Sequence, residues 1–215
     1  GGYLVFTCMN SLSLPPVICV LVAMVVCTLL GITIERVAYK PLRGAPSLAV
    51  LITAIGVSYF LQNMALLIWG SAPKSFNSIV SMEPIRLFDG GLVITGETLV
   101  TIVVSAVIMV GLWLFVNKTK IGRAMLAVSE DRGAAQLMGV NVNATISITF
   151  AIGSALAAIA GALMCSAYPI LQPTTGAMPG IKAFVAAVFG GIGSIPGAMV
   201  GGILLGVIEN LSKAY

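Results

Sequence analysis

The chain alternates between long apolar runs without charge and short polar segments. An apolar helix needs about 20 residues to cross the hydrocarbon core of a membrane. Four uncharged runs of about that length predict membrane-spanning helices: Val17–Ile34, Leu48–Trp69, Thr98–Val116 and Ala144–Tyr168. A fifth uncharged run, Ala183–Ile208, contains several glycines and a proline between Gly190 and Gly197. Because glycine and proline interrupt helices, we expect two shorter helical segments joined by a turn buried in protein, rather than one long tilted helix with a kink.

The polar segments between these runs differ in charge. One carries Arg36, Lys40 and Arg43, and a later one carries Lys118, Lys120, Arg123 and Arg132. The positive-inside rule places both of these segments in the cytoplasm. The Gly70–Glu97 segment carries charges of both signs, and we expect it on the outer side, together with the Pro169–Pro179 loop.

The outer segment also predicts the one β element that we expect. Asp89-Gly90-Gly91 separates the apolar residues of Ile85–Phe88 from Leu92–Thr95, a pattern typical of a β-hairpin. The fold class expected is therefore an all-α integral membrane protein. It would be a polytopic helical bundle with about six transmembrane segments, a broken Gly/Pro-rich late segment and a small outer β-hairpin.

The composition agrees with a membrane protein and excludes several classes of function. The chain is 59% hydrophobic and 8% charged, whereas soluble domains carry about 25% charged residues. The net charge of +4 is spread over loops, so nucleic-acid binding is not expected. The chain has no histidine, and motifs for catalysis, metal binding or nucleotide binding are missing. We therefore expect no enzyme activity in this chain, no cofactor and no metal.

Polar and small residues within the apolar runs suggest two kinds of contact. Ser58 and Gln62 lie four residues apart, on one face of a helix, and Asn63 is adjacent. These side chains would either form hydrogen bonds between helices or line a translocation path. Gly193, Gly197 and Gly201 follow the small-xxx-small spacing that predicts tight helix packing.

The cytoplasmic segment 118–143 predicts a short amphipathic helix. We expect it over Glu130–Met138, with Ser129 as the N-cap, Glu130 and Asp131 in the first turn, and Gly139 at the position that ends it. Its apolar edge consists of Ala134, Leu137 and Met138. A helix this short is unstable alone in water. It therefore needs a partner, which is either the membrane base of this protein or a groove on another subunit.

Several stretches of sequence resemble one family, and together they cover nearly the whole chain. They are ERVAYKPLRGAP (Glu35–Pro46), LITAIGVSYFLQN (Leu51–Asn63), GRAMLAVSED (Gly122–Asp131) and GIKAFVAAVFGGIGSIPGAMVGGILLG (Gly180–Gly206). They resemble the H-type permease of branched-chain amino-acid ABC importers, and the short cytoplasmic helix resembles the coupling loop of such permeases. Residues 1–215 would then be a single permease domain. The resemblance also implies a fragment that lacks a helix at each end.

The resemblance implies partners, a location and a function. In that family the permease works with two cytoplasmic ATPase subunits, a second related permease and a periplasmic substrate-binding protein. The function expected is import of branched-chain amino acids across the inner membrane of a bacterial or archaeal cell. The ATPases would be coupled through Glu130, Asp131, Ala134, Leu137, Met138 and Gly139.

Three alternatives remain open from the sequence. Permeases for urea or short amides look alike, so the substrate is not fixed. A stand-alone channel or an ion-coupled carrier belongs to a different class, and a non-transporting membrane scaffold would also explain the small-residue spacing. The predicted helix over Glu130–Met138 argues against both of these classes, because neither needs an element that receives force from a partner.

Overall fold

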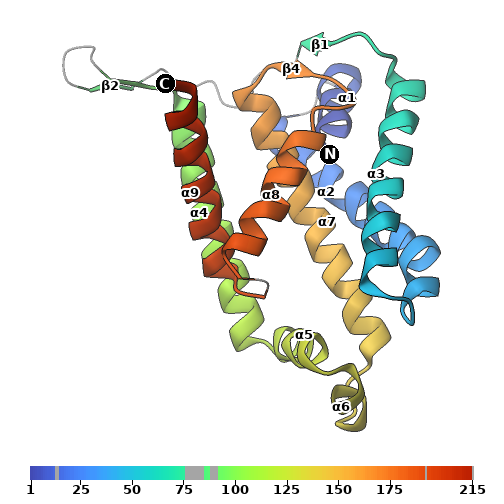
Figure 1. The fold of residues 1–215 in the computed structure, drawn as a ribbon. Helices are drawn as coiled ribbons and strands as arrows, with labels where there is room; N and C mark the ends of the chain where they lie inside the picture. Colours follow the sequence, from blue (N-terminus) through green and yellow to red (C-terminus); the bar gives the residue numbers. More distant parts are fainter. Residues whose placement is uncertain (13–14, 76–84, 88–91, 192, 215) are drawn as a thin grey trace. The chain divides into compact units, whose positions relative to one another are not determined.

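The computed structural model describes residues 1–12, 15–75, 85–87, 92–191 and 193–214 (Figure 1). The chain forms two compact units. One comprises Gly1–Val103 and Asn143–Thr174, and the other comprises Val104–Val142 and Thr175–Tyr215. Each unit is described by itself below.

The first unit is built from four apolar helices, α1 (Gly2–Leu12), α2 (Pro16–Ile34), α3 (Ser47–Trp69) and most of α7 (Val142–Ala167). The helix of α2 does not end at Ile34. It continues through a π-helical turn, η1 (Glu35–Tyr39), and a 3-10 turn, η2 (Lys40–Leu42). The basic segment that the sequence analysis treated as a loop is therefore largely helical.

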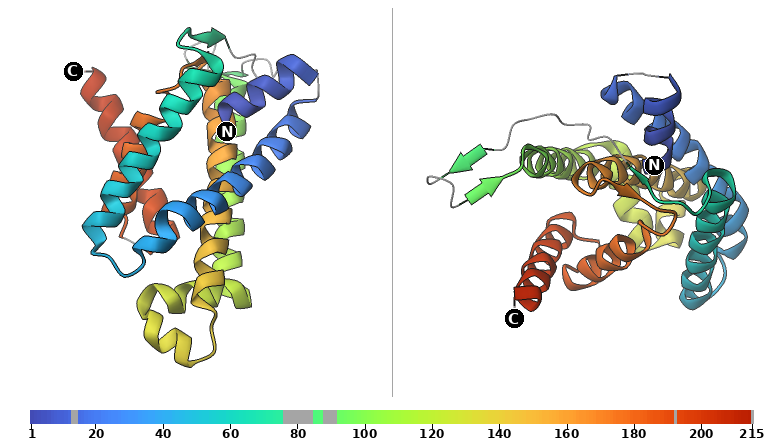
Figure 2. Two further views of the ribbon diagram at one scale, coloured as in Figure 1. Left: turned by 90° about the vertical axis from the view of Figure 1, so that its right-hand side faces the viewer. Right: turned by 90° about the horizontal axis from the view of Figure 1, so that it is seen from above.

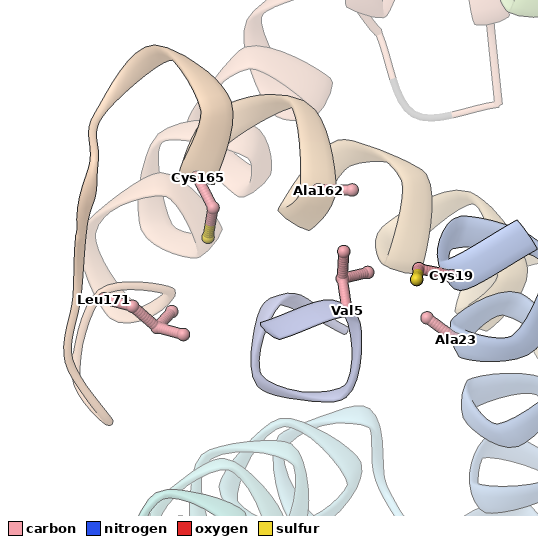
Figure 3. Close-up of a cluster of buried hydrophobic side chains, with 6 residues drawn as sticks. All are labelled: Val5, Cys19, Ala23, Ala162, Cys165 and Leu171. Carbon is pink, nitrogen blue, oxygen red and sulfur yellow. The ribbon is translucent and has the colours of Figure 1, made fainter. Parts of the chain in front are cut away.

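The core of the first unit forms where α1 packs against α2 and α7 (Figure 3). Val5 of α1 is fully buried there. The buried side chains around it are mostly small, and they come from α2, α7 and β4: Cys19, Ala23, Ala162, Cys165 and Leu171. Small side chains allow helix backbones to approach closely without a large apolar core. The sequence analysis did not predict α1, because 11 residues reach only about 16 Å.

Two short strand pairs lie in this unit. Strands β2 (Ile85–Leu87) and β3 (Leu92–Ile94) pair antiparallel, with Leu87 opposite Leu92, which confirms the predicted hairpin. Its Asp89-Gly90-Gly91 turn lies outside the described residues. Strands β1 (Lys74–Ser75) and β4 (Ile170–Leu171) also pair antiparallel. The prediction that the hairpin would be the sole β element is therefore wrong, because the loops after α3 and α7 pair with each other.

The second unit contains the later part of α4 (Gly96–Lys118), then α5 (Lys120–Glu130), α6 (Arg132–Leu137), α8 (Ala177–Phe189) and α9 (Ile195–Ala214). Within the described part of the chain, five helical segments are long and apolar enough to cross a membrane: Pro16–Leu42, Leu48–Trp69, Gly96–Lys118, Val142–Ala167 and Ile195–Ala214. Helix α8 is apolar but has only 13 residues. The predicted all-α polytopic fold is confirmed, and so is the break in the late apolar run.

Helices α8 and α9 form an antiparallel hairpin (Figure 2). Their backbones meet at glycines. A Cβ on Gly197 would lie 1.9 Å from the carbonyl oxygen of Gly190. One turn further, a Cβ on Gly201 would lie 2.3 Å from the carbonyl oxygen of Ala186. Such distances exclude any side chain, so both glycines of α9 lie at the packing surface of the hairpin.

Gly193 contributes to this hairpin in a different way. It lies in the turn between α8 and α9 with a φ of 98°, and no described atom lies within 4 Å of the place that a Cβ would take. The prediction that Gly193 packs between helices is therefore wrong, and so is the prediction of a buried turn, because Gly191, Gly193 and Ser194 are exposed in the described chain. Glycine is favoured there because side chains disfavour positive φ.

Candidate functional site in the α5–α6 segment

Helix α5 begins with a cap that the sequence analysis missed. The Oγ1 of Thr119 accepts a hydrogen bond of 3.0 Å from the backbone N–H of Gly122. Gly122 itself lies against the end of α4, because a Cβ there would be 2.3 Å from the carbonyl oxygen of Val116. The signal was present in the sequence as a Thr cap followed by apolar residues at helical spacing, Ile121, Met125 and Val128.

Asp131 ends α5 and begins α6. Its backbone N–H donates to the carbonyl of Ala127, while its own backbone is extended. Its Oδ1 accepts hydrogen bonds from the N–H groups of Gly133 at 2.8 Å and Ala134 at 3.1 Å. The expectation of one helix over Glu130–Met138 is therefore wrong at its start: Glu130 is the last residue of α5, and Asp131 is the N-cap rather than a first-turn residue.

The prediction of Ser129 as the N-cap is also wrong, for a related reason. Ser129 lies inside α5, and its hydroxyl donates to the carbonyl of Leu126 at 2.7 Å. That hydroxyl is already engaged within the preceding helix. Asp131 is the next residue able to cap, and it stands where α5 stops.

The end of α6 agrees with the expectation for Gly139. Gly139 has a φ of 82°, its N–H donates to Gln136, and the N–H of Val140 donates to Ala135. This pair of bonds is a Schellman motif, which satisfies carbonyls that the helix end would otherwise leave without partners. Helix α6 is thus closed at both ends although it has only six residues.

The residues of the predicted apolar edge lie together on the exposed side of α6. Leu137 is 90% exposed and Met138 is 85% exposed, and Ala134 is exposed as well. Ala135, in contrast, is buried. The structure thus places an apolar edge on the surface of a segment that also carries Lys120, Arg123, Glu130 and Arg132.

The candidate path residues lie in the middle of α3. The Nε2 of Gln62 donates to the Oγ of Ser58 at 3.2 Å, and the Nδ2 of Asn63 donates to the carbonyl of Tyr59 at 2.8 Å. The structure therefore joins Ser58 and Gln62 on one face, while Asn63 turns to its own helix backbone. Ser58 and Asn63 are exposed and Gln62 is half-buried.

Among the described residues, no group of three or more His, Cys, Asp or Glu could hold a metal ion. Helices α5 and α6 present a capped turn with an apolar edge, and α3 presents a short row of amide and hydroxyl groups.

All 215 residues match the family model described as the permease component of branched-chain amino acid transport systems. The chain belongs to this permease family. It is 46% identical over 192 residues to the high-affinity branched-chain amino acid transport system permease protein BraD of Pseudomonas aeruginosa, which covers 87% of this chain and 62% of BraD.

Further relatives extend the match to other organisms. The corresponding permease LivH of Escherichia coli is 44% identical over 197 residues, which covers 90% of this chain and 63% of LivH. A probable LivH of Methanocaldococcus jannaschii is 29% identical over 225 residues, which covers 100% of this chain and 69% of that protein. This chain thus spans somewhat less than two thirds of the length of BraD and of the Escherichia coli LivH. No solved structure matches it.

Family membership and the five long apolar helices make this chain a multi-pass membrane protein of a transport family. A buried carboxylate was also missed by the sequence analysis. Glu35, at the end of the apolar run of α2, is fully buried and contacts Arg43 and Ser147. The signal was a single carboxylate at the start of an otherwise basic segment, which indicates an ion pair.

Proposed function

We propose that this chain is the permease subunit of an ATP-driven importer that moves branched-chain amino acids across the inner membrane of a bacterial or archaeal cell. The proposal rests on family membership together with the exposed, doubly capped helix α6. Its partners would be two cytoplasmic ATPase subunits, a second related permease and a periplasmic substrate-binding protein. ATP would be hydrolysed on the partner subunits and not on this chain.

The observation that carries the proposal is the exposure of Leu137 and Met138. A helix that is capped at both ends would stay helical when a partner subunit displaces it. It would therefore transmit that displacement to α5 and α7, the helices before and after it in the chain. Complete burial of two such side chains contributes about 3–6 kcal/mol in total. An ATPase groove that covers this edge would gain that free energy, and Glu130 beside it would face basic groups of the groove.

The transport path is the second part of the proposal. Ser58, Gln62 and Asn63 would line it, because they place hydroxyl and amide groups halfway along a helix whose other residues are mostly apolar. Displacement of α6 by the ATPase would open this path first to one side of the membrane and then to the other. The binding protein would supply most of the affinity for the amino acid.

The test uses the complete importer, reconstituted in vesicles with the binding protein and ATP. Leu137→Asp would place an unpaired charge in the ATPase groove, which costs about 3 kcal/mol or more, equivalent to about a hundredfold weaker contact. Uptake of labelled leucine and substrate-stimulated ATP hydrolysis should both fall accordingly. Insertion of the chain into the membrane should be unaffected, because Leu137 is 90% exposed.

Gln136→Asp is the matched control, since it adds the same charge about 100° away around the helix. It should retain most uptake. Wild-type uptake by Leu137→Asp would refute the importer mechanism, because a stand-alone channel or an ion-coupled carrier does not need this edge. Competition by urea or short amides in place of leucine, isoleucine and valine would overturn the substrate but keep the mechanism.

A further inference from the structure

The cytoplasmic end of α2 and the beginning of α7 contact each other along one face of α7. The α7 residues that make these contacts are three or four positions apart: Asn143, Ser147, Phe150 and Ser154. Their partners are, in the same order, Arg43, Glu35, Tyr39 and Gly31. We call these eight residues the α2–α7 seam. Its spacing follows the helical repeat, so the seam continues over about three turns of α7.

The part of the seam farther from α6 is packed by an aromatic pair and by a close approach of two helices. The aromatic rings of Tyr39 and Phe150 lie with their centroids 4.9 Å apart. A Cβ on Gly31 would lie 1.9 Å from the Oγ of Ser154, so α2 and α7 touch there without room for a side chain. These contacts keep the two helices in register.

The part of the seam nearer α6 contains an ion pair between Glu35 and Arg43. The carboxylate of Glu35 is fully buried, and both of its oxygens are engaged. Its Oε2 accepts a hydrogen bond of 2.8 Å from the Oγ of Ser147, and its Oε1 accepts one from Arg43. Replacing Arg43 by a neutral residue would leave this buried carboxylate without a compensating charge, which is strongly unfavourable.

Arg43 joins two elements with one guanidinium group. Its Nη2 donates to Glu35 at the end of α2, and its Nη1 donates to the Oδ1 of Asn143 in the first turn of α7. The planar fork of arginine suits such a double contact, whereas a lysine ammonium group does not. Glu35 also opens the π-helical turn η1, a rare geometry that is frequent at functional sites.

The position of the seam along the chain connects it to α6. Helix α6 ends at Leu137 and α7 begins at Val142, so only four residues separate them. Asn143 is the second residue of α7. The connection between α6 and Asn143 is therefore short, and Asn143 is where Arg43 contacts α7.

We propose that Glu35 and Arg43 are positioning residues that pass movement of α6 through the first turn of α7 to α2 and to η2. This proposal rests on the function proposed above, because it requires α6 to receive movement from the ATPase. Neither residue contacts substrate. Their task is to make α2 and the Lys40–Leu42 turn follow α7, which apolar contacts alone would allow to slide.

The experiment measures the amount of leucine transported per ATP hydrolysed by the complete importer in vesicles. Glu35→Gln keeps the size of the side chain and the bond to Ser147 but removes the charge. We expect it to assemble and to hydrolyse ATP, with the transported amount per ATP reduced about tenfold. The control is Thr33→Val, two residues earlier in α2. Its hydroxyl donates to the local carbonyl of Leu29, and the variant should transport as much leucine per ATP as the wild type.

Two further variants separate transmission from folding. Arg43→Lys keeps the charge beside Glu35 but cannot hold Asn143 as well, so the complex should assemble with a reduced ratio. The double variant that exchanges the pair, Glu35→Arg with Arg43→Glu, should transport more leucine per ATP than Glu35→Gln or Arg43→Lys. The reason is that Ser147 and Asn143 can each donate or accept a hydrogen bond. A merely structural contact would lower the yield of complex and leave the ratio unchanged.

The outcomes distinguish this inference from the proposed function. If the wild-type importer transports and Glu35→Gln keeps the wild-type ratio, the seam does not transmit movement and the inference is wrong. If Glu35→Gln fails to assemble, a wild-type ratio in Arg43→Lys overturns it equally. If the wild-type complex itself takes up no leucine, the proposed function fails, and no variant is needed to see it.

Discussion

The α8–α9 hairpin allows a sharp comparison between two adjacent glycines. A Cβ on Gly201 would lie 2.3 Å from the carbonyl oxygen of Ala186, whereas the nearest neighbour of a Cβ on Gly202 would be the Cβ of Ala186 at 3.9 Å. Ordinary contact begins at 3.4 Å, so Gly201→Ala must push the two backbones apart by about 1.1 Å. The atom in the way belongs to the backbone and cannot rotate aside.

Two opposing effects set the change in the free energy of unfolding of each variant. Replacement of glycine by alanine inside a helix stabilises it by about 0.8–1.0 kcal/mol, and both variants gain this. Overpacking costs about 1–3 kcal/mol, and only Gly201→Ala pays this cost. The free energies of unfolding of the two variants should therefore differ by about 1–3 kcal/mol, with Gly202→Ala the more stable.

The assay is thermal unfolding of the purified permease in detergent. At about 2–4 °C per kcal/mol for a chain of this size, the Tm of Gly201→Ala should lie at least about 2 °C below that of Gly202→Ala. Gly206→Ala is a second control, because no described atom lies within 4 Å of the place for its Cβ. Equal or reversed Tm values for Gly201→Ala and Gly202→Ala would show that the close approach of α8 and α9 does not stabilise the protein.

Two further predictions concern helix α6 and the topology. Gly139→Val should lower substrate-stimulated ATP hydrolysis of the importer, because valine disfavours the φ of 82° that closes α6. Gly133→Ala should have a much smaller effect, because Asp131 Oδ1, at 3.3 Å, is the sole described atom within 4 Å of the place for its Cβ. Equal losses would contradict this. Because α8 reaches only about 20 Å, the hairpin cannot cross a core of about 30 Å, so cysteines at Gln172 and Ser212 should both be labelled from outside and one at Ala45 from the cytoplasm. Labelling of Ser212→Cys from the cytoplasm would mean that α9 continues across the membrane.

The long elements could be predicted from the sequence because lipid requires them. A run such as Leu48–Trp69 must satisfy its backbone polar groups internally, so an apolar stretch of that length has one solution, a helix. The break after Phe189 was predictable for a similar reason, since Gly191 and Gly193 favour the positive φ values that they adopt. These properties are local, and they can be read without knowledge of the neighbouring chain.

The details of the candidate site depend on contacts that local patterns do not contain. Ser129 and Asp131 are both good N-caps, and what selects Asp131 is that α5 already extends to Glu130. Likewise, the pairing of Lys182 with Glu209 joins residues 27 positions apart, at 2.6–2.7 Å, across the α8–α9 hairpin. The sequence shows both charges at the limits of an apolar run, but only the fold brings them together.

The exposed apolar side chains of α6 differ from those of the long apolar helices in what can cover them. Exposed apolar side chains on α3 or α9 are expected, because lipid covers them. Leu137 and Met138 lie instead in a segment rich in charged residues, which cannot enter the hydrocarbon core without a large cost. Water would therefore contact both side chains unless protein covers them, and six residues of helix have little stability alone. The caps at Asp131 and Gly139 satisfy backbone groups at both ends of α6, which suits the coupling role proposed for this helix.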